Sequence, residues 1–146
     1  MSARHAPPFR FVDRVLERGA DRCVVLTLVG GTAASRGTGA PERAELPLPL
    51  VIEAMAQAAL PLLEADPDGR SGDRTGAGAA PGLLVGFDGA RLLGPVRPGD
   101  RLKITAQIVA RLGDLIRFRG HAEIDAVRVA EAEFTVVSGA AADGIR

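Results

Sequence analysis

The second half of the chain alternates between apolar and polar positions, which predicts a series of β-strands. Apolar side chains alternate with polar or charged ones in residues 101–111 and again in residues 115–125. Gly113 and Asp114 separate these two runs, so we expect an antiparallel hairpin with one face in water. Residues 127–137 are expected to form the last strand, with small and apolar side chains on one side.

The first part of the chain also contains apolar runs that predict strands. Residues 9–17 and 22–29 flank the turn-forming residues 18–21, so we expect a second β-hairpin there. Residues 82–92 are predicted to form a further strand, which the Gly94-Pro95 pair ends.

Residues 48–65 predict a helix rather than a strand. Pro49 suits the first turn, where a missing N–H costs nothing. Apolar side chains surround nearly the whole circumference, which is typical of a helix buried on most sides. Pro61 is expected to kink or interrupt this helix near Gln57, because its ring clashes with the preceding turn.

Glu53 is the single carboxylate of the apolar run Leu50–Leu60, and Gln57 follows it one turn later. An ionised, unpaired acid on a buried helix costs several kcal/mol, so we expect Glu53 to face a partner, a ligand or an open tunnel. A purely structural role is the alternative, in which Glu53 pairs with an Arg across an interface.

Strands that cluster after one buried helix, rather than alternating with helices, indicate an α+β fold with an antiparallel sheet. A curved sheet wrapped around one central helix accommodates every predicted segment. The length of 146 residues fits a single domain, residues 1–146. Residues 30–47 and 66–81 carry no hydrophobic period, so we expect flexible loops there.

The composition argues against several classes of function. The formal net charge is zero and the basic residues are scattered, so we expect no nucleic-acid surface. The single Cys, Cys23, excludes an internal disulfide framework and is expected to be a buried structural thiol. No Cys and His spacing suggests a metal, and we expect no cofactor. Without a long apolar span or an N-terminal signal pattern, a cytoplasmic protein with no membrane span is expected.

Four sequence blocks, in this order, resemble the β-hydroxyacyl-[acyl-carrier-protein] dehydratases of bacterial fatty-acid synthesis, a family with the hot-dog fold. The blocks are His5–Phe9 leading into Val12–Val15, Val51–Ala58, Gly86–Arg91 and Pro95–Asp100. The resemblance implies a curved antiparallel sheet wrapped around the central helix, and two protomers joined edge to edge. It also implies two acyl tunnels at the interface, each pairing a His of one subunit with a Glu of the other.

In such a site the His removes the α-proton, and the carboxyl helps to deliver the proton with which hydroxide leaves as water. Backbone N–H groups at the helix N-terminus polarise the thioester carbonyl. By the resemblance, Glu53 is the acid, Gln57 at i+4 orients it, and Leu48 contributes the backbone N–H. Arg91 and Arg97 remain from the family's basic rim, so an acyl carrier protein or an acyl-CoA thioester is the expected partner.

The chain departs from the family upstream of the helix. Gly39 stands where the resemblance places the His, and Leu48 stands where the family has a Gly. The chain has only two other candidates, His121 on the polar side of its strand and His5 near the chain start, and we assign both structural or surface roles. Glu42 and Glu45, near the helix start, are interpreted as solvated loop acids.

Three functions are compatible with these residues. The chain is interpreted first as one subunit of a heteromeric dehydratase in fatty-acid or polyketide synthesis, in which Glu53 complements the His of a homologous partner and the homodimer alone has little activity. It could instead be a hot-dog thioesterase that uses Glu53 to activate water or attack the thioester. The third is a non-catalytic acyl-binding or scaffold protein.

Overall fold

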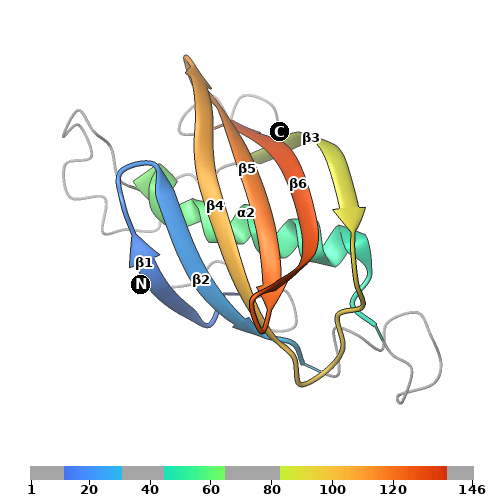
Figure 1. Cartoon of the computed structure of the whole chain (residues 1–146). Coiled ribbons are helices and arrows are strands. Elements are labelled where there is room, and N and C mark those ends of the chain that lie inside the picture. The colour runs from blue at the N-terminus through green and yellow to red at the C-terminus, as the bar shows by residue number, and fades with distance from the viewer. Residues whose placement is uncertain (1–11, 31–44, 65–82, 138–146) are drawn as a thin grey trace.

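A computed structural model describes residues 12–30, 45–64 and 83–137. One antiparallel sheet of six strands, in the order β1-β2-β4-β5-β6-β3, curves around one helix (Figure 1). The elements are β1 (Arg14–Arg18), β2 (Arg22–Leu28), α2 (Leu48–Glu64), β3 (Leu83–Leu92), β4 (Arg101–Leu112), β5 (Leu115–Ile124) and β6 (Val127–Val137). The predicted α+β architecture, with a curved sheet around a central helix, is confirmed.

The face of the sheet toward α2 forms the hydrophobic core. Phe118 of β5 and Phe134 of β6 are buried and stack with ring centroids 5.3 Å apart. Gly120 lies beside them, where a Cβ atom would stand 3.0 Å from a ring carbon of Phe134 and 3.2 Å from the sulfur of Met55 on α2. The missing side chain therefore lets the helix pack closely against the sheet.

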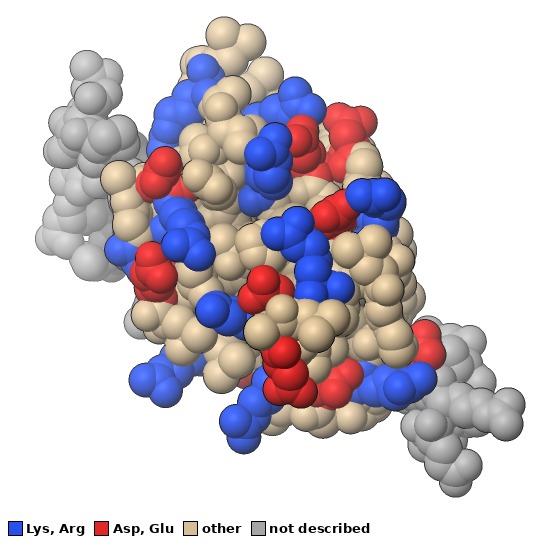
Figure 2. All heavy atoms as spheres, viewed as in Figure 1, with Lys and Arg blue, Asp and Glu red and all other residues tan. Residues whose placement is uncertain are grey.

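The opposite face of the sheet carries charged side chains that pair across neighbouring strands and within β6, and acidic and basic groups are interspersed on it (Figure 2). Glu131 and Glu133 of β6 each contact two guanidinium groups. The ion pairs are Arg91–Glu131, Arg128–Glu131, Arg117–Glu133 and Arg119–Glu133. This arrangement confirms the polar outer face that the alternation in the second half of the chain predicts.

The helix differs from its prediction at Pro61. The sequence predicts a kink or an interruption near Gln57; no interruption occurs, because α2 runs as one helix from Leu48 to Glu64 with Pro61 inside it. Ala58, Ala59 and Leu62 around it are fully buried. Packing of this segment against the sheet therefore outweighs the loss of one backbone hydrogen bond at the proline. Within the described ranges, no helix is long and apolar enough to cross a membrane.

The segment Pro95–Asp100, between β3 and β4, hydrogen bonds to Val29 just after β2 and to Leu46 just before α2. Gly99, in the left-handed region at φ +91°, donates its N–H to the Val29 carbonyl at 2.9 Å, and the Val29 N–H bonds to the Asp100 carbonyl at 3.0 Å. The Leu46 N–H donates to the Val96 carbonyl at 2.7 Å. These backbone bonds fix where the chain enters the helix that carries Glu53.

Candidate active site

Glu53 and Gln57 lie together on α2, as their spacing predicts. The side-chain amide of Gln57 donates a hydrogen bond from Nε2 to Oε1 of Glu53, with the two atoms 3.2 Å apart. Gln57 is buried, with 5% of its surface exposed, whereas Glu53 is half-buried. The core thus holds the Gln57 amide in place, and the amide orients one oxygen of the Glu53 carboxyl. The carboxyl itself remains partly exposed at the boundary of the core.

A carboxyl fixed in this way can act as an acid, a base or a nucleophile. Ile52 and Ala54, its neighbours along the helix, are buried among apolar side chains. An apolar setting strengthens the hydrogen bonds that a polar group makes. The Gln57–Glu53 contact therefore orients a chemically versatile group at the boundary of the core.

Leu48 is the first residue of α2 and is half-buried. The Pro47 carbonyl accepts hydrogen bonds from the N–H groups of Leu50 at 3.0 Å and Val51 at 3.2 Å. Pro49 has no N–H, so the N–H that the first turn can offer a ligand is that of Leu48, which lies at the positive end of the helix dipole. The Leu48 N–H therefore remains the predicted donor to an electron-rich carbonyl.

The two arginines predicted to meet a carrier are both paired with carboxylates of the chain. Arg91 of β3 hydrogen bonds to Glu131 of β6. This bond is the main reason that the pKa of Glu131 lies below its usual value. Arg97 places Nη2 3.7 Å from Oε1 of Glu45, the residue that was interpreted only as a loop acid.

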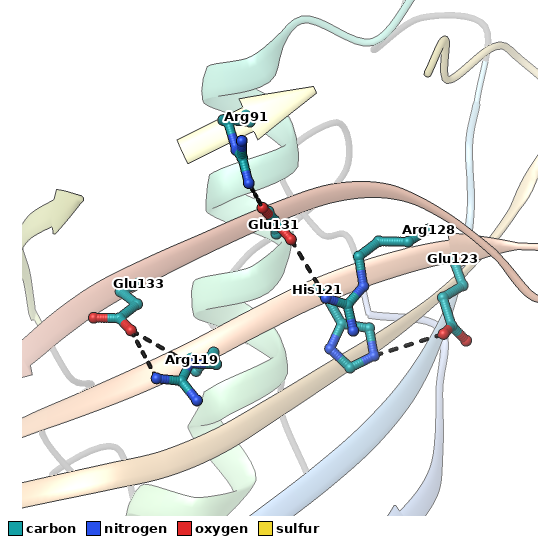
Figure 3. Close-up of polar contacts among 7 residues, drawn as sticks. All are labelled: Arg91, Arg119, His121, Glu123, Arg128, Glu131 and Glu133. Carbon is teal, nitrogen blue, oxygen red and sulfur yellow. Dashed lines mark hydrogen bonds and ion pairs between the residues drawn. The ribbon is translucent and has the colours of Figure 1, made fainter. Parts of the chain in front are cut away.

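His121 lies on the outer face of the sheet, away from Glu53. Its Nε2 stands 3.7 Å from Oε1 of Glu123, in a cluster of Arg and Glu side chains on the strands in front of α2 (Figure 3). Burial, followed by the nearby Arg128 guanidinium, lowers the pKa of His121 below its ordinary value. Because the sheet separates it from the helix, His121 is no base for Glu53 of the same chain.

The remaining predicted residues divide into two groups. Cys23 is fully buried, and burial raises the pKa of its thiol, which fits the expected structural role. His5, Gly39 and Glu42 lie outside the described residues.

Sequence reasoning missed the pairing of Arg97 with Glu45. The two residues are far apart in the sequence, and their contact follows from the backbone bond between Leu46 and Val96. No periodicity in the sequence signals such a contact. The partnership of Arg91 with Glu131 was also missed, although the strand register of β3 and β6 places these residues opposite each other.

Comparison with known proteins identifies close relatives over most of the chain. A curated protein of Anaeromyxobacter dehalogenans (strain 2CP-1 / ATCC BAA-258), the 3-hydroxyacyl-[acyl-carrier-protein] dehydratase FabZ, is 38% identical over 134 residues, which cover 89% of this chain and 81% of the relative. The FabZ of Solibacter usitatus (strain Ellin6076) is 35% identical over 130 residues, covering 88% and 75%. A scan against protein-family models finds no match.

Solved structures share the fold at much lower identity. The dehydratase heterocomplex ApeI:P from Xenorhabdus doucetiae matches with a TM-score of 0.73 at 18% identity, covering 97% of this chain and 90% of that chain. Thioesterase superfamily member 2 from Mus musculus matches with a TM-score of 0.63 at 13% identity, covering 86% and 80%. The structures agree on the hot-dog fold, and the identity and coverage of the FabZ relatives show that this chain belongs to the 3-hydroxyacyl-[acyl-carrier-protein] dehydratase family.

Proposed function

We propose that the protein is one subunit of a heteromeric 3-hydroxyacyl-thioester dehydratase that acts on acyl-carrier-protein-bound intermediates of fatty-acid or polyketide synthesis. The hydrogen bond from Gln57 to Glu53 carries this proposal, because it presents an oriented carboxyl in a chain of the FabZ family. The base is assigned to a His of a homologous partner chain, because by the resemblance Gly39 stands where the family has its His.

In this mechanism each group of the chain has one task. The Leu48 N–H at the start of α2 binds the thioester carbonyl, so negative charge can develop on its oxygen as the partner's His removes the proton from C2. Glu53, in its protonated form, gives its proton to the C3 hydroxyl, the C3–O bond breaks, and water leaves as the C2=C3 double bond forms. Proton transfer from the imidazolium back to the carboxylate, through solvent, restores both groups.

A reconstitution assay tests the composite site. A 3-hydroxyacyl-carrier-protein thioester is added to three samples, and formation of the enoyl product is measured in each. The samples are the purified protein, a homologue that carries the His, and a mixture of the two. We expect dehydration only by the mixture. Glu53→Ala in this chain should lower its rate by about 10²- to 10⁴-fold, the usual contribution of a positioned acid or base.

Glu17→Gln provides the matched control, because Glu17 is an exposed acid on β1, at the far edge of the sheet from β3. Its mixture should keep full activity. Dehydration by the protein alone, or an unchanged rate with Glu53→Ala, would contradict the composite site.

A thioesterase is the second candidate, and the same contact favours it. A carboxyl held by a buried amide can activate water or attack a thioester carbonyl without a His. Hydrolysis of acyl-CoA by the protein alone, lost in Glu53→Ala, would identify this function. The third possibility is a non-catalytic acyl-binding subunit. It is indicated if Glu53→Ala changes neither the rate of acyl-CoA hydrolysis nor the dehydration rate of the mixture, while the protein still binds acyl ligands.

A further inference from the structure

The β4–β5 hairpin ends in an apolar tip. Leu112 is 77% exposed and Leu115 is 41% exposed, and the strand register places their side chains opposite each other on one face of the hairpin. The hairpin projects beyond the neighbouring strands (Figure 1), and uncharged atoms cover its end (Figure 2). Two large apolar side chains that project together in this way are stabilised by a partner that takes them out of water.

The backbone of the tip can leave water with little loss of hydrogen bonds. Leu112 and Leu115 form the last pair of the strand ladder, and only Gly113 and Asp114 lie beyond them. Gly113 adopts φ +58°, the left-handed conformation that a two-residue hairpin turn needs. Such a short turn contains few unpaired N–H and C=O groups, which are the groups that make irregular backbone costly in an apolar medium.

Basic side chains follow directly behind the tip. Residues 108–119 contain three arginines and one aspartate, whereas the formal net charge of the whole chain is zero. Arg117 and Arg119 donate to the same Glu133 carboxylate, at 2.6 Å and 3.0 Å, and both arginine side chains remain exposed. Because two guanidiniums share one carboxylate, positive charge remains behind the tip and attracts a negatively charged surface.

The spacing of these groups matches the layers of a lipid bilayer. Arg117 lies on the same face of β5 as Leu115, and a rise of about 3.3 Å per residue places it about 7 Å behind that leucine. The headgroup layer on each side of a bilayer is about 5–7 Å thick. With Leu112 and Leu115 at the boundary of the acyl chains, Arg117 therefore lies at the depth of the lipid phosphates. A fluid bilayer also accepts a projecting tip without a preformed pocket.

Asp114, in the turn itself, limits how deeply the tip can enter. A carboxylate is costly in the hydrocarbon core but is tolerated at the level of the headgroups. The tip can therefore reach the boundary of the acyl chains and no further, which makes its binding shallow and reversible.

We propose that the tip of the β4–β5 hairpin binds reversibly to an anionic lipid surface, with Leu112 and Leu115 at the boundary of the acyl chains and Arg117 on the lipid phosphates. This binding does not depend on the dehydratase chemistry proposed above, because Glu53 on α2 takes no part in it. The chain thereby has a membrane-docking surface in addition to its candidate active site.

Vesicle flotation measures this binding. Vesicles of an equimolar mixture of phosphatidylcholine and phosphatidylglycerol are compared with vesicles of phosphatidylcholine alone. We expect the protein to bind the anionic mixture about tenfold more strongly than the neutral vesicles. Binding to the mixture should weaken as the salt concentration rises, because salt screens the attraction between arginines and phosphates.

Variants of the tip assign the contacts. The double variant Leu112→Ser/Leu115→Ser should lower the partition coefficient for the anionic vesicles by about tenfold, and Arg117→Gln should lower it by about fivefold. Asp114→Asn should raise it, since the turn then carries no charge into the headgroup layer. A gain of binding cannot result from a loss of folding, so this variant tests the proposal even if the others are less stable.

Val127→Ser is the matched control. Val127 is 64% exposed beside the β5–β6 turn, at the other end of β5, where Asp125 is close in sequence. Its replacement should leave binding unchanged. The proposal is wrong if the parent protein does not bind the anionic vesicles, if it binds both kinds of vesicle equally, or if Val127→Ser weakens binding as much as the double variant does.

Light scattering without lipid distinguishes a membrane from a second protein chain as the partner of the tip. Leu112→Ser/Leu115→Ser should keep the molecular mass of the parent. A lower mass would show that the two leucines cover another copy of the chain, and the lipid surface would be the wrong partner.

Discussion

At the scale of single residues, Thr27 is the polar group whose surroundings match it least. It lies on the helix side of β2 with 1% of its surface exposed, and its hydroxyl has no hydrogen-bond partner in the part of the chain that the structure describes. Burying an unpaired hydroxyl costs free energy that an apolar group of similar shape avoids.

Thr27→Val should therefore stabilise the protein. Valine keeps the branched shape and removes the unpaired oxygen, so we expect the free energy of unfolding to rise by about 1 kcal/mol. Urea unfolding monitored by circular dichroism gives this value. Thr27→Ser is the control that keeps the hydroxyl and loses a methyl group, and it should lower stability by about 1 kcal/mol. A Val variant no more stable than the parent would mean that the hydroxyl has a partner.

Single residues also show what the sequence could and could not predict about the site. The contact of Gln57 with Glu53 was predictable because helical spacing alone brings i and i+4 together. The contact of Arg97 with Glu45 was not, because it depends on how two separate segments are held side by side. A sequence pattern predicts contacts between residues one helical turn apart. It does not predict contacts between segments that are distant in the sequence.

At the scale of elements, the two hairpin turns that flank β5 illustrate the same difference. The β4–β5 turn was predicted from Gly113, which lies at φ +58°. The β5–β6 turn uses Asp125 at φ 50° and Ala126 at φ 66°, left-handed conformations that a side chain makes costly, and so gives no Gly signal. Strand alternation predicted the β4–β5 hairpin and the last strand β6. The uninterrupted α2 through Pro61 shows that tertiary packing can override a local rule.

Opposite substitutions in these turns should have opposite effects. Ala126→Gly removes a left-handed side chain, so we expect the free energy of unfolding to rise by about 1 kcal/mol. Gly113→Ala should lower it by a similar amount, and since an added Cβ there meets no atom within 4 Å, the loss comes from the backbone alone. Thermal unfolding of both variants checks the prediction, which fails if the two changes shift stability in the same direction.

At the scale of the whole molecule, one face of the sheet is charged and the other is apolar. The apolar face extends as far as the edge strand β3. The outer face is covered by ion pairs, whereas the helix side is apolar. Phe87 of β3 lies opposite Phe134 in the strand register and so faces the helix side, yet it is 54% exposed. An apolar row that begins in the core therefore ends uncovered at an edge strand, which can pair with a second chain.

Because the proposed site is shared between two chains, we expect that second chain to cover Phe87. If the parent protein dimerises through this edge, as we expect, Phe87→Arg should leave the protein monomeric and prevent assembly with a His-bearing homologue, since burying an unpaired guanidinium at an apolar interface is costly. Light scattering after size-exclusion chromatography measures the mass of each species. Leu112→Arg is the control, because Leu112 is 77% exposed at the tip of the β4–β5 hairpin and should tolerate the charge. If the Phe87→Arg variant still dimerises and still assembles with the homologue, the second chain does not bind at the β3 edge. The His that acts with Glu53 would then have to come from a chain bound elsewhere.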